Sequence, residues 1–256
     1  FALVFATVVL HGFTIGPLAK RLNLTTTDES GVLIVGGSRF AAELAKSIQD
    51  TGNNVLIIDR NFVSLAAARK HGLNFHVGNI LTEQHDYDLD LTPYKFMLAM
   101  TRSDAYNTHV CEDFAPSLGR ENLFQSAIPD LDEKSDKARL KGGFTLFTPG
   151  MTIRELEVRI NNGHVVRKTL LTEQYSYTQY LRERDDKSVL LYILRKDRSI
   201  SFYSPGEELQ AKAGDTIVTL SAPTKTIERV KERLEEENGD TQIEIEELEN
   251  AFQNLK

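Results

Sequence analysis

The sequence predicts an α/β fold: a doubly wound parallel sheet, preceded by the end of a transmembrane helix and followed by a smaller mixed α+β domain. Three observations lead to this prediction. Apolar runs typical of buried strands alternate with helical patterns between residues 31 and 126. A glycine-bearing turn follows the first of these runs, and an acidic residue follows the second. An uncharged stretch precedes them, and short strands separated by polar turns come after residue 144.

The first element is an uncharged run over residues 1–19 that ends at Lys20 and Arg21. As a helix with a rise of about 1.5 Å per residue it reaches roughly 28 Å, just short of a hydrocarbon core of ~30 Å. The basic pair indicates that this end faces the cytoplasm. We therefore predict the end of a transmembrane helix over residues 1–22 and a polar tether over residues 23–30. A buried helix of a soluble domain is the alternative.

The next stretch predicts the start of a dinucleotide-binding unit. Residues 32–35 form a continuous apolar run, as expected for a strand buried on both faces, and a glycine turn and a helix over residues 42–49 follow. A second buried strand over residues 55–58 ends at Asp59, which lies 23 positions after Gly36. This is the spacing at which a carboxylate accepts hydrogen bonds from the ribose of a bound dinucleotide.

The glycine turn departs from the usual fingerprint. Gly36 supplies the tight turn, but Ser38 stands where a second glycine lets the backbone approach a pyrophosphate, and Ala41 stands at the helix-packing position. The N-terminus of the following helix still predicts an anion site, and Arg39 is placed to pair with a phosphate. A fold that has lost its ligand remains the alternative.

The alternation of strands and helices continues and predicts a Rossmann-like sheet. We expect further strands over 73–77, 94–100 and 123–126, and helices over 62–70 and 103–118. The carboxyl ends of parallel strands meet at one crevice. Asp59 favours an unphosphorylated ribose, whereas Arg60 beside it suits a 2′-phosphate. The predicted ligand-binding residues are Gly36, Gly37, Ser38, Arg39, Phe40, Asp59, Arg60, Asn79, Ile80 and Thr101.

The second half predicts a smaller domain without a recognisable site. We place the first domain at residues 31–143, a small α+β domain at 144–237 and an acidic helical tail at 238–256. The expected strands of the small domain are 164–171, 189–194, 200–203 and 217–220, with helices at 151–159 and 226–237. Short strands joined by polar turns favour a small antiparallel sheet.

Composition excludes several function classes. The net charge is −7, and residues 225–256 contribute −5 of it with 5 basic and 10 acidic side chains. The rest of the chain is therefore close to neutral and has no basic stripe of the kind that binds a nucleic acid. The single cysteine, Cys111, cannot form an internal disulfide. The histidines lack the short spacing of metal ligands, and we predict neither a metal site nor catalytic residues.

Several stretches resemble known families. Residues 35–45 (Val-Gly-Gly-Ser-Arg-Phe-Ala-Ala-Glu-Leu-Ala), 55–59 (Val-Leu-Ile-Ile-Asp), 76–79 (His-Val-Gly-Asn) and 100–107 (Met-Thr-Arg-Ser-Asp-Ala-Tyr-Asn) resemble the RCK or KTN (TrkA-N) regulatory domain of potassium transport systems. That family usually has Gly-Asp where this chain has Gly78-Asn79. Residues 213–218 weakly resemble a TrkA-C ligand domain. Residues 12–24 are similar to the end of the last span of sodium/proton antiporters.

Together these resemblances imply the cytoplasmic regulatory, nucleotide-sensing region of a monovalent cation (sodium or potassium)/proton antiporter of the cell membrane. They imply NAD(H) or an adenine nucleotide as the ligand. The implied partners are a transmembrane transport domain in the same longer chain and a second copy in a homodimer. The resemblance implies regulation without catalysis. An NAD-dependent oxidoreductase and a Rossmann-like dimerisation scaffold that binds no nucleotide remain alternatives.

Overall fold

The computed structural model describes residues 1–21, 31–82, 90–127, 142–148, 150–185, 187–206 and 209–223. The chain divides into the units Phe1–Ser221 and Ala222–Lys256, and both sheets belong to the first. The predicted tether at 23–30, the helix at 226–237 and the acidic tail at 238–256 lie outside the described residues.

The first sheet has six parallel strands in the order β3-β2-β1-β4-β5-β6. The order reverses at β1, which is the doubly wound arrangement predicted from the sequence. The strands are β1 Gly31–Val35, β2 Val55–Asp59, β3 Phe75–Val77, β4 Tyr94–Ala99, β5 Leu123–Gln125 and β6 Phe144–Thr145. The sequence-based prediction ended this domain at residue 143. The sheet also includes β6, which begins at the next residue.

Two helices cover opposite faces of this sheet. One core contains Val32 and Ile34 of β1 together with the buried face of α2 (Arg39–Gln49). The other contains Leu33 and Val35 together with the buried residues of α5 (Asp104–Leu118). Because β1 is enclosed on both faces, all five of its residues are buried, which explains its unbroken apolar run. The short helix η1 (Arg120–Asn122) links α5 to β5.

The helix predicted over residues 62–70 is shorter than expected. Only α3, Ala66–Lys70, is helical, and residues 61–65 form turns. The Asn61 backbone N–H donates to Asp59, and the Val63 N–H donates to the side chain of Asn61. Such side-chain acceptors compete with helical hydrogen bonds and delay the start of the helix.

The second sheet is antiparallel, as predicted, with the order β7-β10-β8-β9. Its strands are β7 Val165–Leu170, β8 Val189–Leu194, β9 Ile200–Phe202 and β10 Thr216–Ser221. The helix α6, Ile153–Asn161, precedes it and begins with a capping box between Thr152 and Glu155. The helix α7, Tyr177–Glu183, was not predicted.

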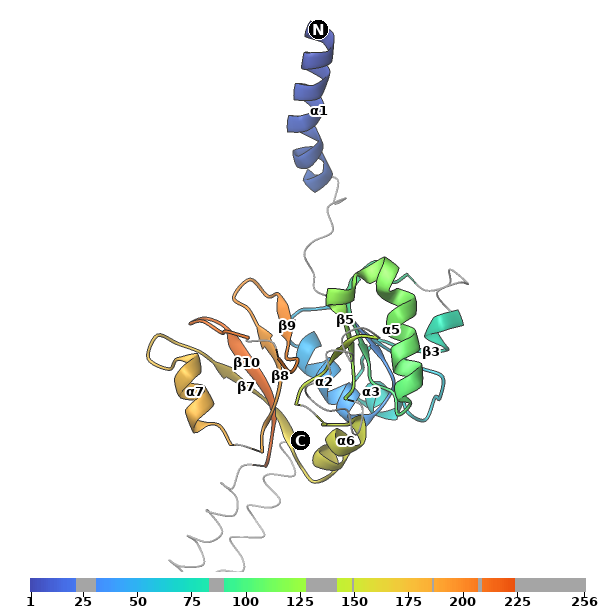
Figure 1. Ribbon diagram of the computed structural model, residues 1–256, viewed down its shortest axis with the longest axis vertical. Coiled ribbons are helices and arrows are strands. Elements are labelled where there is room, and N and C mark those ends of the chain that lie inside the picture. The colour runs from blue at the N-terminus through green and yellow to red at the C-terminus, as the bar shows by residue number, and fades with distance from the viewer. Residues whose placement is uncertain are drawn as a thin grey trace, which may run out of the picture. The chain divides into compact units, whose positions relative to one another are not determined.

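A shared core joins the two sheets. The core that buries α2 also contains Leu156 of α6 and Phe202 of β9. The rings of Phe96 and Phe202 meet edge to face with centroids 5.5 Å apart. The hydroxyls of Ser47 and Tyr192 are hydrogen-bonded at 3.0 Å, so α2 lies between the sheets (Figure 1). Movement of one sheet therefore disturbs packing against the other.

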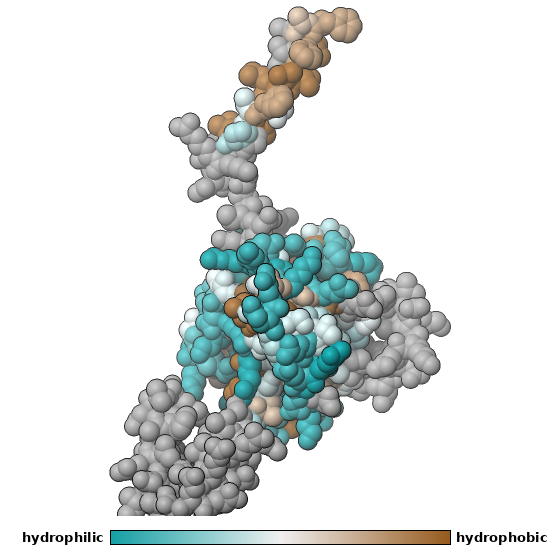
Figure 2. Space-filling model, turned by 90° about the vertical axis from the view of Figure 1, so that its left-hand side faces the viewer, coloured by the Kyte–Doolittle hydropathy of each residue, from teal (hydrophilic) through white to brown (hydrophobic). Residues whose placement is uncertain are grey.

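The first helix, α1, spans Ala2–Arg21 and contains Pro17. Its described large apolar side chains are exposed. In Figure 2 this helix is mostly hydrophobic in colour, whereas the face of the folded part that the view shows is mostly hydrophilic. Two of its polar side chains bond within the helix: His11 contacts the Thr7 carbonyl and Thr14 donates to the Leu10 carbonyl. The segment is helical, as expected, but the prediction that it is the end of a transmembrane helix is not confirmed. In the part of the chain that the structure describes, no helix combines the length and apolar character needed to cross a membrane.

Candidate functional site

Two adjoining cavities open where β1, β2 and β4 end. The strand-end cavity has a volume of about 480 Å³ and reaches from Gly36 past Asp59 to Tyr106. The turn cavity has a volume of about 400 Å³ and lies between the glycine turn, the start of α3 and α6. Gly36, Asp59, Thr101 and Arg102 border both cavities. The two form one crevice at the point where the strand order reverses, the usual ligand position in such sheets.

Gly36 and Gly37 are required by the close packing of this turn. Gly36 has φ 115°, and a Cβ there would lie 2.7 Å from the Met100 carbonyl oxygen. A Cβ on Gly37 would lie 2.8 Å from the carbonyl oxygen of Ser64. Both glycines thus let the turn approach neighbouring backbone segments of the same chain.

Ser38 begins α2 and caps it. Its side-chain oxygen accepts a hydrogen bond of 3.0 Å from the backbone N–H of Ala41. Its hydroxyl hydrogen is still available to donate to a phosphate while the oxygen accepts. Ala41 is fully buried in the core, in keeping with its helix-packing position.

The N-terminus of α2 also contacts α6. The backbone N–H of Phe40 donates to Glu157 Oε1 at 2.6 Å, and Arg39 donates to Asn161 Oδ1 at 2.9 Å. Phe40, a predicted ligand-binding residue, lines neither cavity: its ring is buried and its backbone N–H is bound by Glu157. Glu157 lines the turn cavity and was not among the site residues predicted from the sequence. It lies 117 positions from Phe40, and no short motif connects the two.

Asp59 links the glycine turn to the end of β2. One carboxylate oxygen accepts from the Gly37 backbone N–H at 2.7 Å, and the other accepts from the Asn61 N–H at 2.7 Å. Each oxygen has two lone pairs, so each can accept one more hydrogen bond. The carboxylate therefore both supports the turn and can receive a ribose hydroxyl.

The far wall of the strand-end cavity is built around Tyr106. Its hydroxyl donates to Asn79 Oδ1 at 2.6 Å, and the Arg60 guanidinium lies over its ring at 5.2 Å. Burial raises the pKa of Tyr106, although the nearby Arg60 opposes the shift. The hydroxyl is therefore protonated and donating at neutral pH. Asn79 acts on the cavity through Tyr106 and does not line it.

Thr101 is held by a buried amide. Asn107 accepts from the Thr101 N–H at 3.0 Å and from its hydroxyl at 2.6 Å, and donates to the Thr101 carbonyl. Asn107 is 1% exposed, so this network fixes the turn after β4.

Most of the predicted ligand-binding residues meet at this crevice. Those on the cavity walls are Gly36, Gly37, Ser38, Arg39, Asp59, Arg60, Ile80 and Thr101. Their contact with a ligand stays a prediction. Tyr106 was missed as a site residue, although it stands in the 100–107 stretch that carries the family resemblance.

The single cysteine, Cys111, is buried in α5. Burial raises the pKa of Cys111 to about 12, so its thiol is protonated at neutral pH. Among the described residues, no group of three His, Cys, Asp or Glu side chains could hold a metal ion.

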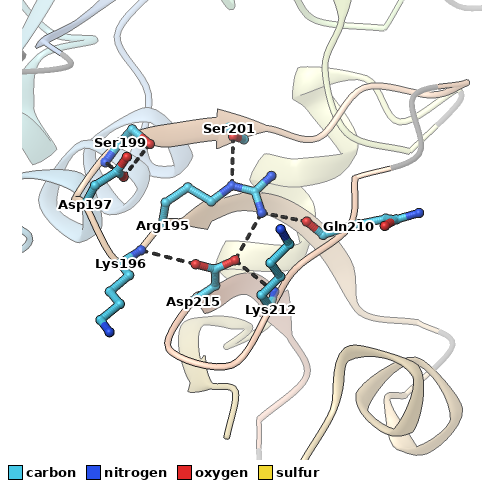
Figure 3. A network of polar contacts seen from close by, with 8 residues as sticks. All are labelled: Arg195, Lys196, Asp197, Ser199, Ser201, Gln210, Lys212 and Asp215. Atoms are coloured by element: carbon cyan, nitrogen blue, oxygen red, sulfur yellow. Dashed lines mark hydrogen bonds and ion pairs between the residues drawn. The ribbon is translucent and has the colours of Figure 1, made fainter. Parts of the chain in front are cut away.

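A second carboxylate network lies in the antiparallel sheet (Figure 3). Asp215 accepts from the Arg195 guanidinium at 3.1 Å and from the backbone N–H groups of Lys196 and Lys212. Arg195 also donates to Ser201 and to the Gln210 carbonyl. Asp215 is 6% exposed, and this network ties three chain segments together.

The family comparison matches residues 32–120 to the TrkA-N domain. This part of the chain is therefore a TrkA-N (RCK) domain, as its sequence resemblance predicted. A search of curated proteins gives no match.

Solved structures that this chain matches include those of GsuK. The crystal structure of the GsuK RCK domain shares 12% identity at a TM-score of 0.39, over 81% of this chain and 46% of that chain. The GsuK channel bound to NAD shares 14% identity at a TM-score of 0.39, over 77% and 37%. N5-carboxyaminoimidazole ribonucleotide synthetase from Thermotoga maritima shares 11% at a TM-score of 0.27, over 75% and 46%. The chain spans less than half the length of each of these proteins.

Proposed function

We propose that this chain is the cytoplasmic regulatory region of a monovalent cation/proton antiporter and that its crevice senses NAD(H) or an adenine nucleotide. The observation that carries the proposal is the crevice itself. A glycine turn, the N-terminus of α2 and Asp59 surround two adjoining cavities at the ends of parallel strands. Their volumes lie within the range of roughly 300–1,000 Å³ that is usual for small-ligand pockets.

The crevice suits the parts of such a ligand. The strand-end cavity combines the apolar side chains of Ile58 and Ile80 with the hydroxyl-bearing ring of Tyr106, a suitable lining for a nucleoside. Asp59, at the boundary of the two cavities, would accept the ribose hydroxyls. Arg39 and the N-terminus of α2, at the turn cavity, would receive phosphate.

Sensing requires that the ligand bind two conformations with different affinity. The crevice is suited to this because the turn cavity is bordered by the first sheet's glycine turn and by Ile153 and Glu157 of α6. A ligand in this cavity would act on both parts of the described unit. We propose that α1 links this unit to a transport domain in a longer chain. We also propose that two copies of the chain form a homodimer.

Isothermal titration calorimetry of the 256-residue chain with NADH, NAD, AMP and ATP tests the proposed ligand. We expect saturable binding of at least one of them. Binding of none would refute nucleotide sensing and favour the non-binding scaffold. Hydride transfer from NADH to a carbonyl substrate would instead favour an oxidoreductase.

The transport role needs a separate measurement in the longer chain. Cation/proton exchange in reconstituted vesicles should change when the bound nucleotide is supplied on the side of this domain. Exchange that is independent of the nucleotide would refute the regulatory role while leaving ligand binding intact.

A further inference from the structure

The N-terminus of α2 already holds two oxygen atoms of its own chain. The Ala41 N–H is bound by Ser38 Oγ, and the Phe40 N–H is bound by Glu157 Oε1. A helix N-terminus carries a partial positive charge of roughly half a unit and attracts anions. The Glu157 carboxylate therefore takes the position at which a ligand phosphate would bind this helix.

Glu157 is held firmly in this position by the packing of its helix. Ile153, Leu156 and Ile160 of α6 are buried in the core that α2 shares with both sheets. Glu157 itself is half-buried on the face of α6 that lines the turn cavity. Its contact with Phe40, at 2.6 Å, has the short length of a charge-assisted hydrogen bond.

The same helix also engages the cation of the glycine turn. Asn161 follows Glu157 by one helical turn and accepts a hydrogen bond from Arg39. Two groups that would bind a phosphate, the Phe40 N–H and the Arg39 guanidinium, are thus both bound by α6. The carboxylate is charged and the amide is neutral, so Glu157 should oppose an incoming phosphate more strongly than Asn161.

We propose that Glu157 determines which ligands enter this crevice by occupying its anion position. A nucleoside can fill the strand-end cavity without meeting Glu157, which lines the turn cavity alone. A ligand with a diphosphate must displace the carboxylate from the Phe40 N–H, because two anions in contact at one site repel each other strongly. This inference rests on the proposed nucleotide-binding function.

Displacement of Glu157 would transmit the binding of a diphosphate ligand to the second sheet. α6 leads directly into β7, and its buried side chains share one core with Phe202 of β9. Release of the contacts to Phe40 and Arg39 would loosen α6 from the glycine turn. Diphosphate ligands would therefore change the second sheet, and adenosine would not.

The variant Glu157→Gln tests the charge while keeping an oxygen that can accept from Phe40. We expect its affinity for ADP and NADH to rise about tenfold or more, as removal of a nearby like charge predicts, and its affinity for adenosine to stay unchanged. Glu173→Gln is the matched control, since Glu173 is exposed in the loop before α7. Calorimetry with adenosine, AMP, ADP and NADH provides the measurement.

The outcomes separate this inference from the proposed function. Equal binding of ADP and NADH by the wild-type chain and Glu157→Gln would refute the role of Glu157 and leave nucleotide binding intact. Binding of no nucleotide by either protein would refute both. An equal gain for adenosine and ADP would also refute the inference, since a general structural change would not depend on phosphate charge.

Hydrogen exchange provides a second, independent measurement on the wild-type chain. Saturation with NADH should increase exchange in Ile153–Asn161, whereas saturation with adenosine should not. Unchanged protection of this helix in the NADH-bound protein would overturn the proposed displacement.

Discussion

Asp59 in the crevice and Asp215 in the antiparallel sheet use the same chemistry for different ends. Both carboxylates accept backbone N–H groups from neighbouring turns. Asp215 also binds the Arg195 guanidinium and is 6% exposed, whereas Asp59 is half-buried and borders two cavities. The hydrogen-bonding capacity of Asp215 is used within the protein by a charged partner and two backbone groups. The carboxylate of Asp59 borders open space, where the proposed ligand would bind.

The largest effect should come from breaking the hydrogen-bond network around Asp215. Asp215→Ala removes the acceptor of one guanidinium and two backbone N–H groups, and we expect a loss of about 3 kcal/mol in the free energy of unfolding. Urea denaturation measures it. Asp197→Ala is the control, because Asp197 accepts from Ser199 in the exposed turn beside this network (Figure 3). An equal loss in both variants would contradict the structural role of Asp215.

A smaller effect, on ligand binding, should come from changing Asp59 in the crevice. Asp59→Asn keeps one side-chain oxygen for the turn but removes the charge that strengthens hydrogen bonds to ribose. We expect NADH affinity to fall about 10- to 100-fold, the worth of a charge-assisted hydrogen bond. Calorimetry measures this change. Asp50→Asn, at the exposed C-terminal end of α2, is the control for loss of charge. Unchanged NADH affinity in Asp59→Asn would contradict the assignment of Asp59 to the ligand.

The smallest effect should come from the wall of the strand-end cavity. Tyr106→Phe removes the hydrogen bond to Asn79 and keeps the ring beneath Arg60. We expect a loss of about 1 kcal/mol in stability, the net contribution of a neutral hydrogen bond, and a few-fold lower NADH affinity. Thermal unfolding and calorimetry are the measurements. If Tyr106→Phe weakened NADH binding more than Asp59→Asn, the hydroxyl rather than the carboxylate would be the main ligand contact.

Local patterns predicted the strands of both sheets closely because each strand carries its own signal. The run of residues 189–194 predicted β8 at its observed bounds, and Ser103 predicted the cap of α5. The two-residue strand β6 was missed because so short a segment shows no periodicity. The helix at 62–70 was overestimated because Asp59 and Asn61 accept hydrogen bonds from the turn before α3.

The same distinction holds at the crevice. Gly36 and Asp59 could be placed from the sequence, because topology brings the ends of neighbouring parallel strands together. Glu157 could not, because its contact with Phe40 depends on how α6 packs against α2 in the shared core.

The sequence by itself determined the alternating elements, the parallel sheet and the position of the crevice at the strand ends, since apolar periodicity and strand direction are local properties. Only the tertiary structure decided what stands at the N-terminus of α2. That choice depends on packing between segments over a hundred positions apart, where a shared core places the carboxylate of Glu157 against the backbone N–H of Phe40. The physical reason is that hydrogen bonds across a core depend on three-dimensional distance, which no local pattern encodes.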